Sequence, residues 1–149
     1  MIQRRFVRET VLQAVYAYLQ SGESISHIID TLLAKNLKED GEAMRFGERL
    51  FVLTLEQTDE WDAIIKQHTK NWEISRLALI DKIILYISLS ELTNFPDIPT
   101  KVTINEAIDI AKKYSTAKSG RFVNGILDAS LIQLEKEQKI LKTGRGLIG

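Results

Sequence analysis

The chain of 149 residues contains no cysteine, only two prolines and only two histidines. The absence of cysteine excludes disulfides, thiolate-bound zinc and a cysteine nucleophile. No apolar run reaches the roughly 18 to 20 residues that a membrane-spanning helix needs, so no membrane partner is expected. Arginines occupy the segment where a signal peptide would carry its apolar stretch, which predicts a cytoplasmic protein.

The composition is typical of one folded domain and shows no excess of charge of either sign. Hydrophobic residues make up 44% and charged residues 27% of the chain, and the formal net charge is zero. The charges are nevertheless uneven, with a net +2 in residues 1–21, −6 in residues 22–62 and +4 in residues 101–149. This asymmetry would allow a polyanion to bind one basic surface. In an equally favoured alternative, the charges are scattered by chance over solvated faces.

The two prolines, Pro96 and Pro99, fall in one short segment, and strong helix formers dominate elsewhere. Strand-like alternation and hairpin dipeptides are missing, so the sequence predicts an all-α fold without a sheet. The six or seven expected helices cover about 3–20, 24–36, 42–69 with a break near 57–59, 76–93, 103–114 and 119–137. Residues 1–138 are predicted to form a single domain, and residues 139–149 a disordered basic tail.

Local signals predict how several of these helices begin. Ser24 or Ser26 is expected to cap the second helix. Thr103 and Glu106 have the spacing of a capping box, and Ser119 is expected to begin the last helix. Residues 76–93 are apolar on every side, which predicts a helix in the middle of a bundle.

Residue patterns typical of catalysis are scarce. His27 and His68 have no neighbours at metal-ligand spacing, and both are interpreted as structural or solvated. Residues 59–62 include three acids, which fit a solvated helix surface better than a metal site. No glycine-rich phosphate loop occurs in a strand-to-helix context. The sequence therefore predicts no enzyme activity, no metal and no cofactor.

The first helix carries a candidate binding face. At 100° per residue, Arg5, Arg8 and Tyr16 fall together with Leu12, opposite the core positions of the same helix. Exposed arginine beside an exposed aromatic ring suits single-stranded nucleic acid, because the guanidinium binds phosphate and a base stacks on the ring. In the alternative interpretation, Leu12 and Tyr16 pack under another helix and the arginines are merely solvated.

A second candidate lies at the start of the last helix. Lys118, Arg121 and Phe122 again combine cations with an aromatic ring, next to a helix N-terminus that favours anions. In the alternative interpretation this segment is an interhelical corner, with Phe122 in the core and Gly125 allowing close packing.

These segments resemble the NusB family of transcription antitermination factors. The similarity begins with RRFVRETVLQAVYAY at residues 4–18 and continues through Asn71-Trp72 and the segment 76–92, which ends in Ser-Glu-Leu. It extends through IPTKVTINEA at residues 98–107 and closes on Ser119, FVNG at residues 122–125 and Leu127-Asp128. Such a long ordered signature is far more specific than any short motif.

The resemblance implies a fold of two small helical bundles that binds the boxA element of ribosomal RNA leader transcripts. It also implies a protein partner, NusE, and action on the elongating RNA polymerase complex. The implied RNA-binding residues are Arg4, Arg5, Arg8, Tyr16, Lys118, Arg121 and Phe122, and Asp81 is the residue implied to face NusE.

The sequence departs from the family pattern in two features that bear on RNA binding, and the first is a basic N-terminal run shorter than in many relatives. Several relatives carry an acid where this chain has Lys118, and a cation there should strengthen binding and its salt dependence. Some family members self-associate, so a homodimer stays open beside a monomer. Two other functions stay open as well: an RNA-targeting domain related to those of ribosomal RNA cytosine methyltransferases, and a helical adaptor that binds only protein.

Overall fold

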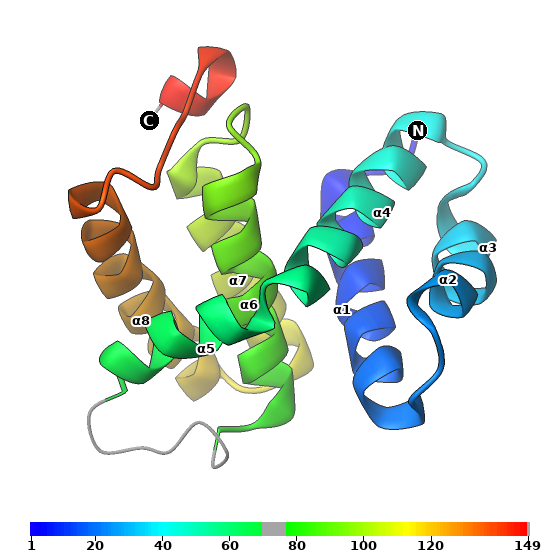
Figure 1. The fold of residues 1–149 in the computed structure, drawn as a ribbon, viewed down its shortest axis with the longest axis horizontal. Helices are drawn as coiled ribbons and strands as arrows, with labels where there is room; N and C mark the ends of the chain where they lie inside the picture. The colour runs from blue at the N-terminus through cyan, green and yellow to red at the C-terminus, as the bar shows by residue number, and fades with distance from the viewer. Residues whose placement is uncertain (70–76, 149) are drawn as a thin grey trace. The chain divides into compact units, whose positions relative to one another are not determined.

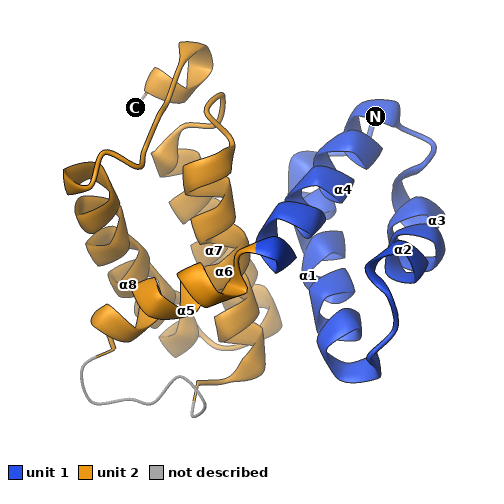
Figure 2. Ribbon diagram, viewed as in Figure 1, with its two compact units in different colours: residues 1–56 blue, residues 57–149 orange. Residues whose placement is uncertain are grey.

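A computed structural model describes residues 1–69 and 77–148, and every regular element in these ranges is helical (Figure 1). The all-α fold class is therefore confirmed. The chain divides into two compact units, residues 1–56 and 57–149, in keeping with the two bundles that the resemblance implies (Figure 2). Asn71, Trp72 and Arg76, which contribute to that resemblance, lie outside the described residues.

The first unit is built around helix α1 (Arg4–Ser21), which packs along α4 (Gly41–Glu56). In the sequence between α1 and α4, the chain forms a continuous helical stretch of α2 (Ile25–Ile28), a π-helical segment (Ile29–Leu33) and α3 (Ala34–Leu37). Helix α1 ends at Gly22, whose φ of 72° is left-handed and suits glycine. Ser24 caps α2 by accepting the His27 N–H at 3.0 Å, which decides between the two predicted caps.

Close packing in this unit depends on a glycine. A Cβ atom at Gly47 would lie 2.7 Å from Leu37 Cδ1 and 3.1 Å from Val7 Cγ1, so α4 approaches its neighbours where it has no side chain. The side chains around this contact form the core of the unit: Val7, Val11, Ala14, Leu33, Leu37 and Leu50.

The second unit surrounds one central helix, α6 (Leu79–Asn94), which contacts α5 (Thr58–Gln67), α7 (Thr100–Tyr114) and α8 (Ala117–Lys136). The predicted break near residues 57–59 occurs at Gln57, between α4 and α5. Because α6 has neighbours on several sides, its apolar residues are buried around its circumference, as predicted. They include Ile83, Ile84, Leu85, Ile87, Leu89 and Leu92.

Two predicted helix starts are wrong. Helix α7 begins at Thr100 after Pro99, so Thr103 lies inside the helix and its hydroxyl donates to Glu91 Oε1 at 2.8 Å. Both of these side chains are buried, and a tertiary hydrogen bond has replaced the capping box. Helix α8 begins at Ala117, and Thr116 is its cap, accepting the Ser119 N–H at 3.0 Å.

The C-terminal segment packs on the second unit. The Lys142 ammonium donates to the carbonyl oxygens of Phe95 at 2.8 Å and Glu91 at 3.4 Å, at the C-terminal end of α6. The Thr143 N–H donates to the Pro96 carbonyl at 3.0 Å, and a 3-10 turn follows at Gly144–Leu147. The carbonyl oxygens of Glu91 and Phe95 each also accept a backbone N–H, from Phe95 and from Ile98, so the ammonium binds at the second lone pair. The disorder predicted for residues 139–149 stays a prediction beside these contacts of Lys142 and Thr143.

None of the described helices has the length and apolarity needed to cross a bilayer.

Candidate functional site

The basic N-terminus of α1 is held in place by Asp40. Its carboxylate accepts the Ile2 N–H at 2.9 Å and the N–H groups of Glu42 and Ala43 at 3.1 and 3.3 Å, at the start of α4. These hydrogen bonds, that from Ile2 first, lower the pKa of Asp40 below its usual 3.8. The chain entering α1 is thereby tied to the start of α4.

The predicted binding face of α1 is only partly exposed. Arg8 is 5% exposed and Leu12 is 2% exposed, so neither belongs to an open surface. Residues 7–12 are all buried, which means that this turn of α1 is covered all round. The helical wheel placed these two residues opposite the core but could not show that other parts of the protein cover that side too.

Arg4 and Arg8 both lie against an aromatic ring. The guanidinium carbon of Arg4 is 4.3 Å from the centroid of the Phe46 ring on α4, and that of Arg8 is 5.5 Å from it. Such distances are typical of cation–π contacts. Arg8 therefore serves packing within the first unit, whereas Arg4 remains exposed at its surface.

Two aromatic rings remain accessible on α1. Tyr16, a predicted site residue, is 44% exposed, and Phe6, which sequence reasoning missed, is equally exposed. Arg5 is half-exposed beside Phe6 in the sequence. The signal that could have identified Phe6 was an aromatic residue directly after two arginines, in a helix whose core positions were already filled.

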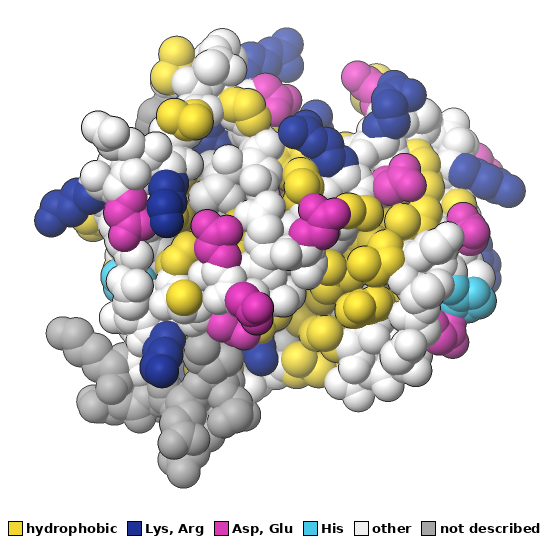
Figure 3. Space-filling model, in the orientation of Figure 1, with side chains coloured by type: hydrophobic (Ala, Val, Ile, Leu, Met, Phe, Trp, Pro, Cys, Tyr) yellow, Lys and Arg dark blue, Asp and Glu magenta, His cyan; other side chains and the backbone are white. Residues whose placement is uncertain are grey.

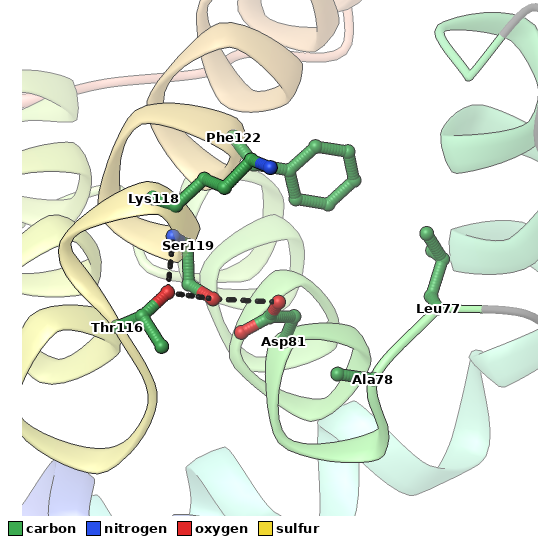
Figure 4. Close-up of a pocket in the computed structure, with 7 residues that line it drawn as sticks. All are labelled: Leu77, Ala78, Asp81, Thr116, Lys118, Ser119 and Phe122. Carbon is green, nitrogen blue, oxygen red and sulfur yellow. Dashed lines mark hydrogen bonds between the residues drawn. The ribbon is translucent and has the colours of Figure 1, made fainter.

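In the second unit, hydroxyl groups fasten the start of α8 to α6 (Figure 4). The Ser119 hydroxyl donates to Asp81 Oδ2 at 3.0 Å and accepts a hydrogen bond from Thr116 at 3.2 Å. The Ser115 hydroxyl lies 2.9 Å from that of Ser119. Asp81 is only 7% exposed, so little of its side chain is available to a protein partner, and its predicted role toward NusE stays a prediction.

A pocket of about 210 Å³ opens beside this hydroxyl network. Figure 4 shows Asp81 and Ser119 on one side of it, with the Phe122 ring and Leu77 across from them. Lys118 is exposed at the rim, and Arg121, on the same turn of α8, is exposed as well. The complete lining is Leu77, Ala78, Asp81, Thr116, Lys118, Ser119 and Phe122.

The structure thus brings Lys118, Phe122 and Asp81 together, although the resemblance implies a separate role for Asp81. Phe122 is half-buried at the pocket and not sealed in the core. Arg4, Arg5, Arg8 and Tyr16 belong to the first unit. A single surface joining the start of α1 to the start of α8 involves both units and stays a prediction.

The remaining polar residues flagged by the sequence have structural contacts. His68 Nε2 lies 2.6 Å from Gln133 Oε1, and His27 pairs with Glu23 one turn earlier. Asp62 accepts a hydrogen bond from the Tyr86 hydroxyl, and burial together with this bond raises the pKa of Tyr86. Within residues 1–69 and 77–148, no group of three or more side chains could hold a metal ion.

Charge is dispersed on the face drawn in Figure 3, where Lys and Arg side chains alternate with Asp and Glu. A broad basic coat of the kind that binds nucleic acid without selectivity is not seen on that face. On that face, a polyanion site would have to be small and local.

Comparison with known proteins decides the family. The model of the NusB family matches residues 5–131, which include both α1 and the start of α8. The chain belongs to the NusB family. Transcription antitermination protein NusB of Salinibacter ruber is 44% identical over 149 residues, covering 100% of this chain and 93% of its own length.

Solved structures of NusB proteins share the fold. NusB of T. maritima aligns with a TM-score of 0.83 and 32% identity, over 93% of this chain and 96% of its own. A crystal structure of antitermination factors NusB and NusE in complex with dsRNA aligns with a TM-score of 0.78 and 26% identity. That alignment covers 87% of this chain and 96% of the other.

Proposed function

We propose that this NusB-family chain is an RNA-binding transcription antitermination factor. It binds the single-stranded boxA-type element of ribosomal RNA leader transcripts together with NusE and acts on the elongating RNA polymerase complex. Membership of the family and the fold shared with a NusB–NusE–RNA complex support this proposal. Its place of action is then the cytoplasm, and its role is regulatory binding without catalysis.

One observation carries the RNA-binding part of the proposal. Exposed Lys118 and Arg121 precede the half-exposed Phe122 in the first turns of α8, a helix of 20 residues. The cations and the positive end of the helix dipole attract phosphate, while the ring offers a base a stacking surface. A stacked base contributes about 1–3 kcal/mol by the standard of alanine substitution.

The first helix supplies a second set of contacts. Exposed Arg4 and half-exposed Arg5 are available to phosphate, and Tyr16 and Phe6 to bases. Arg8 contributes indirectly, because its guanidinium packs over Phe46 beside that of Arg4. We therefore expect an Arg8 substitution to act on RNA through the stability of the first unit.

Binding of NusE is expected to strengthen binding of RNA. A neutral chain gains little from non-specific attraction to phosphate, so affinity for RNA alone is modest. Coupling between two bound partners is typically about 1–3 kcal/mol and is reciprocal, so RNA should tighten NusE binding by the same factor. A homodimer that covers the RNA surface would compete with RNA.

A pair of matched lysine variants tests the assignment of the RNA surface. Lys118 and Lys136 are exposed at opposite ends of α8, so replacing either with alanine removes the same charge from the same helix. We expect Lys118→Ala to weaken binding of boxA-type RNA and to reduce the salt dependence by about one phosphate contact. Lys136→Ala should leave both unchanged. Equal effects of the two variants in a salt titration would contradict the proposed surface.

A further inference from the structure

The C-terminal turn, residues 141–148, has one side that fits closely against the loop after α6. Gly146 is buried, and a Cβ atom there would lie 1.9 Å from the Pro96 carbonyl oxygen. Gly144 has a left-handed φ of 53°, which also suits glycine. Together with the hydrogen bonds from the turn to the end of α6, these glycines fix which side of the turn faces the protein.

The other side of the turn carries exposed apolar side chains. Leu141, Leu147 and Ile148 are 70%, 72% and 67% exposed. Figure 3 shows hydrophobic side chains gathered at this segment, with Lys or Arg side chains beside them. Single exposed apolar residues are normal on a protein surface, whereas several on one short turn form a patch, and such patches mark interaction sites.

The composition of the segment defines the partner that it fits. Residues 138–149 contain three cations, Lys139, Lys142 and Arg145, and neither an acidic nor an aromatic residue. Carboxylates complement the positive charge, and leucine and isoleucine side chains fit an apolar groove. RNA is a poor match, because proteins bind single strands with rings on which the bases stack. The patch therefore suits a protein surface with an apolar groove bordered by acidic residues.

The turn is remote from the surface proposed for RNA on the same unit. It contacts the end of α6, whereas Asp81 and the start of α8 lie together at the beginning of that helix (Figure 1). The helix rises about 15 Å between Asp81 and Glu91. A partner on the turn can thus be bound at the same time as RNA at the start of α8.

We propose that the C-terminal turn binds RNA polymerase directly, with Leu147 and Ile148 in an apolar groove and Arg145 beside carboxylates at its edge. The inference rests on the proposed function, which requires the chain to reach the elongating polymerase complex. Within that complex, RNA is assigned the basic and aromatic residues of α1 and α8, and NusE is assigned Asp81. Polymerase has no surface assigned to it, and the turn supplies one of different chemistry.

The test compares two affinities of the chain, both measured with NusE present. One is for a purified RNA polymerase elongation complex that carries boxA-type RNA, and the other is for the same RNA without polymerase. A direct contact predicts that polymerase tightens binding of the wild-type chain at least about tenfold, because burial of one leucine or isoleucine side chain contributes that factor or more.

A double variant, Leu147→Ser with Ile148→Ser, removes the apolar side chains and keeps the charge, so it should lose this gain. Ile132→Ser is the matched control, because Ile132 is 61% exposed on α8, outside the turn, and it should keep the gain. Gly146→Ala tests the seat of the turn. Its methyl group displaces the turn from Pro96 and leaves the docking side chains unaltered, so the gain should fall in this variant too.

The outcomes separate this inference from the proposed function. If polymerase tightened binding of the wild-type chain and of the double variant equally, or of neither, the docking turn would be overturned and RNA binding would stand. Weaker binding of boxA-type RNA by the double variant without polymerase would assign the turn to RNA and likewise overturn the inference. A wild-type chain that bound polymerase through the turn but did not bind boxA-type RNA would refute the proposed function and keep the docking turn.

Discussion

Ser119→Ala is the substitution that probes the site most sharply. The Ser119 side chain is nearly buried and is hydrogen-bonded to Asp81 Oδ2 at 3.0 Å and to the hydroxyls of Ser115 and Thr116. Removing the hydroxyl leaves both carboxylate oxygens of Asp81 without a hydrogen bond from the described residues. A hydrogen bond to a charged group contributes about 1.5–3 kcal/mol, so we expect the free energy of unfolding to fall by about 2–3 kcal/mol.

Urea unfolding followed by tryptophan fluorescence measures this loss in the relevant part of the chain. Trp61 is fully buried in α5, within the second unit, so its fluorescence reports on that unit. Ser130→Ala is the matched control. Ser130 is also buried on α8, but its hydroxyl has no hydrogen-bond partner among the described residues.

Ser130→Ala should leave the free energy of unfolding unchanged or raise it slightly, because it removes a buried hydroxyl that no described residue satisfies. If Ser119→Ala lost no more stability than Ser130→Ala, the hydroxyl network would not hold α8 to α6. In that case the proposed positioning of the pocket would be wrong. A double-mutant cycle with Asp81→Ala should give a coupling energy of at least about 1 kcal/mol between the two side chains.

Three further predictions concern other parts of the chain. Arg8→Ala should lower the free energy of unfolding of the first unit by about 2 kcal/mol, because packing on Phe46 is lost. Circular dichroism in urea measures this change. An unchanged midpoint of urea unfolding would contradict a packing role for Arg8. Because the pKa of Asp40 is lowered in the folded chain, its stabilising contribution is present above pH 3.8 and is lost as the pH falls through the folded value. Asp40→Asn should therefore reduce the loss of unfolding free energy at acidic pH. An unchanged acid dependence of stability would show that this carboxylate is not tied to the backbone. Lys142→Ala should accelerate hydrogen exchange at the Thr143 amide, because the C-terminal segment loses its hydrogen bonds to the end of α6. If this amide already exchanged rapidly in the wild-type chain, the result would favour a disordered tail.

Much of the fold could be predicted from sequence, because the signals involved are local. The end of α1 at Gly22, the cap at Ser24 and the break at Gln57 follow from neighbouring residues. The apolar circumference of residues 76–93 was sufficient to place α6 at the centre of its bundle. Thr103 was misassigned because its spacing to Glu106 fits a capping box, whereas its hydroxyl binds Glu91, on another helix.

The candidate site was predicted less completely. Lys118, Arg121 and Phe122 were identified because cations, an aromatic ring and a helix start are adjacent in sequence. Burial of Arg8 depends on packing against other helices, which a wheel of α1 alone does not contain. The link between Asp81 and Ser119 joins residues 38 positions apart, so no periodicity or spacing could reveal it.

The central claim is that this chain selectively binds boxA-type RNA and does so more tightly with NusE. Fluorescence anisotropy of a labelled boxA-type RNA, titrated with the chain in the presence and absence of NusE, measures both properties against a scrambled RNA of equal length. The account predicts selective binding of the boxA-type RNA that NusE strengthens by about 5- to 150-fold. Equal or absent binding of the two RNAs under both conditions would contradict it.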